Sequence, residues 1–327
     1  MNLKATKITL LGLLAIALLM LPYLAANLYT LHILILIGIY IITGMGLNIV
    51  FGYAGQISLG HGAYFAIGAY VSAILTTRLG LPFEIAFICA GVISFLFGIA
   101  IGIPTLKLEG SYLAMATIGF SEIVRMVLIN WEALSGGPAG ISKIPDPSIF
   151  GIAFHTLQSK YYLVLGVFVV GFICYRNLIR SGYGKQLMAV RENPLAAAAM
   201  GVDTARIKVL AFALSTLYAG IAGCLYAHLN RYVAPDAFHI YESVTLLLIV
   251  VLGGRGSILG PILGAILLIE MKESLRMLKD YNMLIFGLSL MIFMIYMPNG
   301  LMGLKVFRLW NWVRRRDSAG LNAGQTP

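Results

Sequence analysis

Residues 176–208 read RNLIRSGYGKQLMAVRENPLAAAAMGVDTARIK. They are the longest stretch with helix-forming residues that interrupts the apolar runs of this chain. The stretch is basic, and its middle holds an alanine-rich segment between Asn193-Pro194 and Gly201. Its basic residues are Arg176, Arg180, Lys185, Arg191, Arg206 and Lys208. Because Lys and Arg accumulate in cytoplasmic loops of membrane proteins, this pattern predicts a cytoplasmic connector.

The composition of the whole chain is that of a membrane protein. Of 327 residues, 60% are hydrophobic and 11% are charged, whereas soluble domains carry about 25% charged residues. Apolar runs near the length needed to cross about 30 Å of hydrocarbon as a helix recur throughout, without the alternation of barrel strands. The sequence predicts an all-α, polytopic transmembrane bundle of about ten spans (eight to ten). The expected spans are 8–28, 31–52, 59–78, 83–105, 110–130, 161–180, 207–229, 240–254, 258–276 and 282–303.

The net charge, the cysteine positions and the N-terminal run argue against nucleic-acid binding, disulfides, a metal site and a cleaved signal peptide. The net charge of +10 could indicate nucleic acid, but the basic residues lie in short loops, where they set orientation. Cys89, Cys174 and Cys224 lie in apolar runs without metal-site spacing, so we expect neither disulfides nor a metal site. The N-terminal apolar run continues to about residue 27 without a convincing cleavage site, which favours a retained span over a signal peptide.

The distribution of charge predicts the topology. Ten spans place both termini on one side. With the termini inside, fifteen Lys and Arg residues are cytoplasmic and seven are external, which favours this orientation. We expect one transmembrane domain over 1–316 with a cytoplasmic loop at 181–206 and a flexible cytoplasmic tail at 317–327. The external loop, 131–160, is rich in turn formers and predicts a short lid or surface helix.

A glycine-rich stretch at 51–70, FGYAGQISLGHGAYFAIGAY, predicts close helix contacts, since small residues let backbones approach in lipid. Its polar and glycine positions of interest are Gly55, Gln56, Ser58, Gly60 and His61. Two interpretations stay open: a packed, hydrogen-bonded junction, or a broken helix that borders a translocation path. For His61, a hydrogen-bonding core position is favoured over a metal ligand or proton relay.

A second glycine-rich stretch, VLGGRGSILGPILGA at 251–265, faintly echoes the first. Gly253, Gly254 and Gly256 could resemble a phosphate loop, but GxxxxGK[ST] occurs nowhere in the chain. A nucleotide site in this polypeptide is therefore not expected. A helix break that lets Arg255 reach the cytoplasmic interface is the simpler interpretation.

Within the span at 110–130, Glu122 and Arg125 stand three residues apart and could form an intramembrane ion pair. An ionisable residue inside a span is a functional hypothesis by default. A structural pair near the outer interface, with Arg125 reaching towards Trp131, explains the pattern equally well.

The alanine-rich segment predicts a short helix from Pro194 to Met200. Asn193 suits the N-cap and Pro194 the first helical position, and Gly201 is a natural stop. Outward alanines suit insertion into a groove on another protein. An amphipathic connector lying on the membrane is the alternative.

Five motifs carry a resemblance to a known family: 45–70, 108–125, 136–141, 191–203 and 247–265. At these residues the chain resembles the permease subunits of bacterial branched-chain amino acid ABC importers, of the LivM type. The resemblance implies a type II importer-like permease that works with a second permease subunit (forming a hetero- or homodimer), two cytoplasmic ATPases and a periplasmic or extracellular binding protein. ATP and Mg would bind to the ATPases, and no cofactor or catalytic residue is expected in this chain. The implied ATPase-coupling residues are Arg191, Glu192, Asn193, Pro194, Ala197 and Gly201.

These observations favour a non-enzymatic subunit of the bacterial cytoplasmic (inner) membrane that imports branched-chain amino acids by ATP-driven alternating access. The implied translocation-path or helix-break residues are Gly55, Gln56, Ser58, Gly60, His61, Gly253, Gly254 and Gly256. The alternatives are an ion-coupled secondary transporter, for which Glu122 is the main intramembrane carboxylate, and an ABC permease for urea or short amides. An intramembrane hydrolase is disfavoured because Ser58 and His61 lack an acidic orienting residue.

Overall fold

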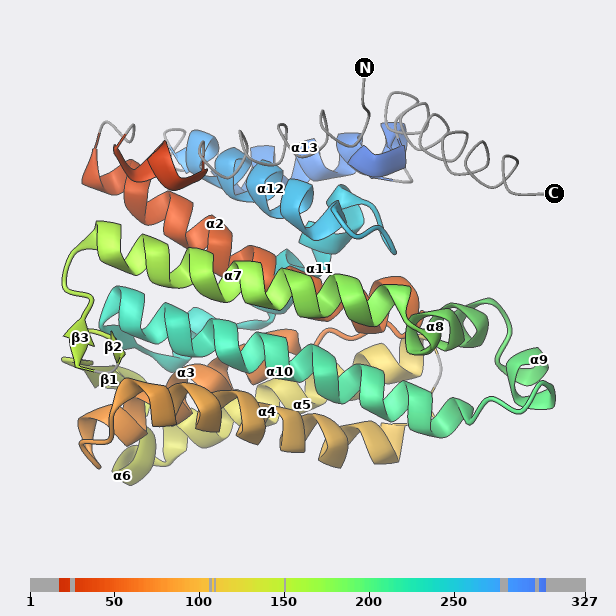
Figure 1. Cartoon of the computed structure of the whole chain (residues 1–327), viewed down its shortest axis with the longest axis horizontal. Coiled ribbons are helices and arrows are strands. Elements are labelled where there is room, and N and C mark those ends of the chain that lie inside the picture. Colours follow the sequence, from red (N-terminus) through yellow and green to blue (C-terminus); the bar gives the residue numbers. More distant parts are fainter. Residues whose placement is uncertain are drawn as a thin grey trace, which may run out of the picture.

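The computed structural model describes residues 18–23, 27–105, 108, 110–149, 151–276, 282–297 and 300–303. Long helices lie side by side across the molecule (Figure 1). The α-helices, long and short, are α2 (Leu28–Leu47), α3 (His61–Thr77), α4 (Phe83–Thr105), α5 (Ser111–Asn130), α6 (Glu132–Ser135), α7 (Leu157–Arg180), α8 (Gly182–Glu192), α9 (Pro194–Ala199), α10 (Thr204–Asn230), α11 (Ile240–Gly253), α12 (Gly260–Arg276) and α13 (Asn282–Tyr296). A π-helical turn, Asn48–Tyr53, extends α2, and short 3-10 turns occur at Gly137–Ala139, Pro235–Phe238 and Leu301–Gly303.

The predicted helical class is confirmed. Each expected span after the first coincides with a helix, and five helices within the described residues are long and apolar enough to cross a membrane. They are Leu28–Tyr53, Phe83–Thr105, Ser111–Asn130, Leu157–Arg180 and Thr204–Asn230. The remaining predicted spans correspond to shorter helices, of 14 to 17 residues. The expected span at 8–28 falls mostly outside the described residues, as does the expected tail at 317–327.

The predicted start of α7 was four residues too late. The helix begins at Leu157 instead of 161, because Thr156 and Ser159 form a reciprocal capping box. This cap provides hydrogen-bond acceptors for backbone N–H groups at the start of α7 that would otherwise lack them.

The centre of the bundle is formed by α10, which packs against α3 and α4. Glycines make this contact close: a Cβ atom on Gly68 would lie 2.5 Å from Cα of Gly220, and one on Gly220 would lie 2.6 Å from the carbonyl oxygen of Ala90. Both distances are far below van der Waals contact. The prediction that small residues at 51–70 bring helix backbones together is therefore confirmed for Gly68.

The connections gather at two opposite ends of the bundle (Figure 1). One end holds α6 and two antiparallel strand pairs, and the other holds α8 and the protruding α9. The strands are β1 (Ile141–Ser142) paired with β4 (Tyr232–Val233), and β2 (Ser148–Ile149) paired with β3 (Ile152–Ala153). The loops at 131–160 and 181–206 thus lie at opposite ends, as the predicted topology requires.

An ion-pair cluster fixes the loop at 131–160 onto the bundle. The carboxylate of Asp146 lies 2.8 Å from the Lys160 ammonium and 3.0 Å from Nδ1 of His155. The Lys160 ammonium also donates to the carbonyl of His228, whose ring contacts the carbonyl of Pro145 at 2.8 Å. Partial burial opposes ionisation of Asp146, but the bonds to Lys160 and His155 hold its pKa below the usual value. The Asp146 carboxylate is therefore ionised and stabilising at neutral pH, and its contribution is lost as acid protonates it.

We predict that Gly220→Ala destabilises the bundle by about 1–3 kcal/mol, the usual cost of overpacking a filled interior. The added methyl group would press on the Ala90 backbone, which cannot yield like a flexible side chain. Thermal unfolding of the purified protein in detergent measures the effect. Gly166→Ala on α7 is the matched control, since a Cβ there meets nothing within 4 Å. Equal melting temperatures for the two variants would contradict the packing role of Gly220.

Candidate functional site: a junction of two helix breaks

The first helix break follows α2. The helix passes into the π-helical turn Asn48–Tyr53, residues 55–60 are not helical, and α3 begins at His61. Gly55 has a φ of +73°, a conformation that suits glycine. The predicted interruption is confirmed. Gln56, Ser58 and Gly60 are buried in protein, where non-helical backbone is tolerated, and Gly55 is exposed.

The second break separates α11 from α12. The chain leaves α11 at Gly253, passes through Gly254 and Gly256 at positive φ, and re-enters helix at Gly260. A Cβ on Gly253 would lie 2.5 Å from the carbonyl carbon of Gly260, so the two helix ends approach closely. This predicted break is also confirmed.

Asn48 joins the two breaks through its side-chain amide. Its Oδ1 accepts a hydrogen bond from the Gly256 amide at 3.0 Å, and its Nδ2 donates to the Ser257 carbonyl at 2.8 Å and the Tyr175 hydroxyl at 2.7 Å. The side chain is fully buried. Because a buried amide with satisfied partners fixes one geometry, Asn48 holds the second break against the first.

Arg191 connects the C-terminal end of α8 to these helix breaks. Its guanidinium donates a 2.5 Å hydrogen bond to the Gly52 carbonyl, and a Cβ on Gly256 would lie 2.8 Å from the same group. The stem of Arg191 lies against Gly55. Asn48, Gly52, Arg191 and Gly256 are called the helix-break junction below. Arg191 was predicted as an ATPase-coupling residue; its charged group is bonded within the bundle, and the coupling role stays a prediction.

The predicted short helix is present as α9 and ends one residue earlier than expected, at Ala199. Asn193 is its N-cap and accepts a hydrogen bond from the Ala196 amide at 3.0 Å, and Gly201 follows at a φ of +84°. Glu192 and Gly201 are exposed, and Pro194 is half-buried.

The outer face of α9 carries exposed alanines, as expected, at Ala196, Ala198 and Ala199, together with larger apolar residues. Ala197 is buried, so it is not an outward contact residue as predicted. Leu195 and Met200 are each 84% exposed, and neither was identified from the sequence. The available signal was that they are the large apolar residues on either side of the alanine run.

Ser58, Gly60 and His61 belong to the packed core. The Ser58 hydroxyl lies 3.1 Å from Nδ1 of His61, and the Nε2 atom of that ring lies 2.5 Å from the Ser215 hydroxyl. A Cβ on Gly60 would lie 2.9 Å from the carbonyl of Thr117. The expectation that His61 is a hydrogen-bonding core residue is confirmed.

The predicted pair on α5 is present. Arg125 approaches both carboxylate oxygens of Glu122, with a shortest distance of 2.6 Å, and it also lies 3.9 Å from Asp236. Glu122 remains 46% exposed. The pair is therefore on an open face of the bundle.

A second polar cluster inside the bundle was missed. Glu242 on α11 accepts a 2.5 Å hydrogen bond from Tyr40, and Lys272 on α12 donates to Thr245 at 3.2 Å. The signal was available, because Glu242 lies inside the predicted span at 240–254. Its partners are more than 25 residues away in sequence and could not be inferred locally.

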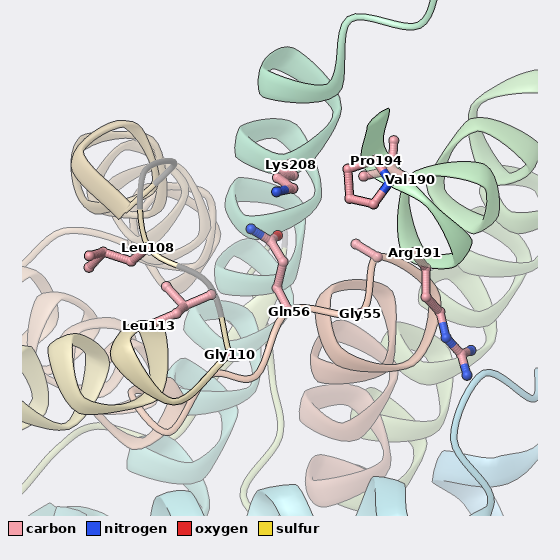
Figure 2. Close-up of a pocket in the computed structure, with 10 residues that line it drawn as sticks. Gly55, Gln56, Leu108, Gly110, Leu113, Val190, Arg191, Pro194 and Lys208 are labelled. Carbon is pink, nitrogen blue, oxygen red and sulfur yellow. The ribbon is translucent and has the colours of Figure 1, made fainter. Parts of the chain in front are cut away.

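One cavity is lined both by residues of the predicted first helix break and by predicted ATPase-coupling residues. Gly55 and Gln56 from the first break face Arg191 and Pro194 from the α8–α9 connection across about 210 Å³ (Figure 2). The remaining lining residues are Ala54, Leu108, Gly110, Leu113, Val190 and Lys208. Gly253, Gly254 and Gly256 do not line it.

The fold and the junction define a polytopic helical membrane protein whose helix breaks are linked to a protruding helix. Residues 29–295 match the family described as branched-chain amino acid transport system / permease component. The chain therefore belongs to this family of permease components.

Curated relatives agree with the family assignment. The chain is 38% identical to the high-affinity branched-chain amino acid transport system permease protein LivM of Salmonella typhimurium, over 81% of this chain and 68% of the relative. The corresponding LivM of Escherichia coli is also 38% identical, over 84% and 70%. The LivH permease protein of Salmonella typhimurium is 23% identical, over 81% and 91%. No solved structure matches the chain.

We predict that Asn48→Leu loosens the junction, because the substitution leaves the Gly256 amide without its partner and the Ser257 carbonyl with only the 3.5 Å contact to the Tyr175 hydroxyl. Each unsatisfied buried group costs about 1–3 kcal/mol. The expected results are a lower melting temperature in detergent and faster tryptic cleavage after the exposed Arg255. Asn130→Leu serves as the control, since that amide bonds only within its own helix, to Met126. If both variants behave alike, Asn48 does not hold the breaks together.

Proposed function

We propose that this chain is one of two membrane-spanning subunits of an ATP-driven importer of branched-chain amino acids. Two cytoplasmic ATPases bind ATP and Mg, and a binding protein outside the membrane delivers the substrate. The family and the relatives named above support this assignment, and none of them favours an ion-coupled transporter. The chain lies in the bacterial cytoplasmic membrane with α9 and both termini in the cytoplasm.

The observation that carries the mechanism is the contact of Arg191 with Gly52. In this proposal, the ATPases move α9, and α8 transmits the displacement through the Arg191 guanidinium to the first helix break. Asn48 passes it to the second break. The helices at both breaks then tilt together. Nucleotide binding thereby changes the side of the membrane from which the translocation path is accessible. An ATPase can shift this equilibrium only by its differential affinity for the two states.

The open face of α5 supports a second permease subunit. Tyr112, Met115 and Ile123 are each more than 60% exposed, and the Glu122–Arg125 pair lies on the same helix. Lipid is a poor environment for a half-exposed ion pair inside a span. A protein partner or a water-filled path between two subunits suits both the apolar and the charged residues.

We predict that Arg191→Met uncouples the transporter. The variant keeps much of the side-chain length but cannot donate to the Gly52 carbonyl, so α8 loses its link to the breaks. Transport per ATP hydrolysed should fall about tenfold, within the range of typical coupling free energies. Uptake of labelled leucine and ATP hydrolysis are measured on the same proteoliposomes. Lys185→Met, at an exposed position of α8, is the control, and an unchanged ratio for Arg191→Met would refute the link.

We also predict that Leu195→Ser combined with Met200→Ser weakens binding of the ATPase. Exposed apolar residues on a protruding helix are suited to anchor an interface, and each anchor contributes more than about 1 kcal/mol. The dissociation constant should rise at least about tenfold by biolayer interferometry. Leu79→Ser is the control, since it removes an exposed apolar residue between α3 and α4, at the other end. Unchanged affinity of the double variant would mean that α9 is not the docking helix.

A further inference from the structure

The glycine-rich motif at 136–141, GGPAGI, holds two distant segments of the chain together. It lies just before β1, at the end of the bundle opposite to α9 (Figure 1). Gly140 has a φ of +69°, and a Cβ atom there would lie 2.0 Å from the carbonyl oxygen of Val233. Only glycine allows the motif to approach the backbone of the segment after α10 so closely.

Further contacts join the same two segments. In the β1–β4 pair, Ile141 lies opposite Val233, and Ser142 lies opposite Tyr232. The Tyr232 hydroxyl donates to the Ala139 carbonyl at 3.0 Å. Residues 139–142 and 232–238 are called the end clamp below. Each strand contains only two residues, so the pair is small enough to separate without unfolding a helix.

The end clamp positions Phe238 as a plug. This side chain is 2% exposed, although the two residues before it in the same 3-10 turn are exposed. Its ring centroid lies 5.9 Å from that of Phe65 and 6.2 Å from that of Tyr70, both on α3. The Tyr226 ring of α10 lies at 6.1 Å. One aromatic side chain from a connecting turn therefore fills the space between α3 and α10.

The closed position of Phe238 is opposed by an unsatisfied polar group. The ring of Tyr70 contacts Phe238, and Tyr70 is 2% exposed, yet its hydroxyl has no hydrogen-bond partner among the described residues. A buried polar group without a partner destabilises the arrangement that buries it. Withdrawal of Phe238 would admit water to this hydroxyl, which offsets part of the cost of opening.

The turn that carries Phe238 is held weakly on the side of α5. Asp236 lies 3.9 Å from Arg125, and its side chain is 74% exposed. Exposed ion pairs contribute little to stability. Ala234 and His239, on either side of the turn, have extended backbone conformations. Residues at the ends of a short connection can absorb the rotation that a moving turn requires.

Helix α11 connects this turn to the helix-break junction. Only His239 separates Phe238 from the start of α11, and the other end of α11 is Gly253, at the second break. A tilt of α11 therefore displaces the turn. Residues 139–142 instead continue into the loop that the Asp146–Lys160 ion pair fixes onto the bundle. The two halves of the end clamp thus belong to parts that move differently.

The opposite end of the bundle is hollow. The cavity of about 210 Å³ lies there, between the first helix break and the α8–α9 connection (Figure 2). A bundle that is plugged at one end and hollow at the other has the asymmetry of one state in an alternating-access cycle.

We propose that the end clamp is the outer gate of the importer and that Phe238 closes it. This inference rests on the proposed function, whose topology places the end clamp outside the cell. When the helix-break junction tilts α11, the turn Pro235–Phe238 withdraws and β4 separates from β1. A path beside α3 then opens for the amino acid that the binding protein releases. Return of α11 closes the gate before the amino acid leaves on the cytoplasmic side.

A reversible cross-link tests whether the end clamp must open. Ser142→Cys and Tyr232→Cys are combined in a variant whose native cysteines are replaced. Opposite residues of an antiparallel pair have Cα atoms about 4.5–5.5 Å apart, a separation that a disulfide spans. In proteoliposomes with the complete transporter and the loaded binding protein, oxidation should lower uptake of labelled leucine at least about tenfold, because gating steps limit transport. Reduction by dithiothreitol should restore uptake.

The second strand pair provides the matched control. Ser148→Cys with Ala153→Cys places a disulfide across β2 and β3, at the same end of the bundle but outside the end clamp. Its oxidation should leave uptake unchanged. A disulfide breaks no existing contact, so a purely structural clamp would tolerate it. Full uptake with the 142–232 disulfide completely formed, as judged by loss of free thiols, would overturn the proposal.

Thiol accessibility gives a second, independent readout. Val233→Cys introduces a side chain of similar size at a position that is 1% exposed. Its modification by a sulfonated maleimide, in nanodiscs, should be at least about tenfold faster during ATP hydrolysis with the loaded binding protein than without nucleotide, as the open population rises. Ala237→Cys, exposed in the same turn, should react at one rate in both conditions. Equal rates for Val233→Cys would also overturn the gate.

Failure of the gate is distinguishable from failure of the proposed function. If the wild-type complex imports leucine with ATP and the 142–232 disulfide has no effect, the function stands and the gate is wrong. If the wild-type complex imports no leucine, the proposed function is wrong, and the accessibility of Val233→Cys still decides whether the end clamp opens.

Discussion

The hydrogen bond from the Arg191 guanidinium to the Gly52 carbonyl connects the part of the molecule that protrudes to the part that is buried. The Gly52 carbonyl lies in a π-helical turn, where the regular helical ladder is disturbed. The same turn presents Asn48 to the second break. Removal of the Arg191 contact would leave α8 and α9 attached to the bundle through packing, the covalent chain and the hydrogen bond from the Tyr183 hydroxyl to the Ile207 carbonyl on α10, and this bond does not reach the helix breaks.

This connection depends on glycine at both breaks. A side chain at Gly52 would collide with the Gly256 amide at 2.7 Å, and one at Gly256 would collide with the Arg191 guanidinium. The bundle around the junction is held rigidly, since α10 packs against α3 and α4 through backbone-to-backbone contacts. At the opposite end, the ion pair of Asp146 and Lys160 fixes the connecting segment. In the proposed mechanism, a displacement of α9 would therefore be concentrated in the two breaks and would not be absorbed by a soft bundle.

Local signals in the sequence were sufficient for much of this structure. Apolar runs predicted the helices, the Asn193-Pro194 pair and Gly201 predicted α9, and clustered glycines predicted both breaks. Contacts between distant segments were not predictable in the same way. Nothing near Arg191 indicates that its guanidinium turns inward to residue 52, and nothing near Asn48 indicates a partner 208 residues away. The inward position of Ala197 depends on how α9 packs against α10, which a six-residue helix does not encode by itself.

The most direct test of the account is whether α9 and the second break move as one unit. Spin labels at Ala199→Cys, an exposed position of α9, and at Leu259→Cys, in a variant whose native cysteines are replaced, report their separation by double electron–electron resonance. If the helix-break junction transmits the motion, the distance distribution stays narrow and unshifted between the nucleotide-free and ATP-bound complexes, and it broadens when Arg191 is replaced by Met. A shift of several ångströms on ATP binding with Arg191 intact would show that α9 moves independently of the breaks, which would contradict the account.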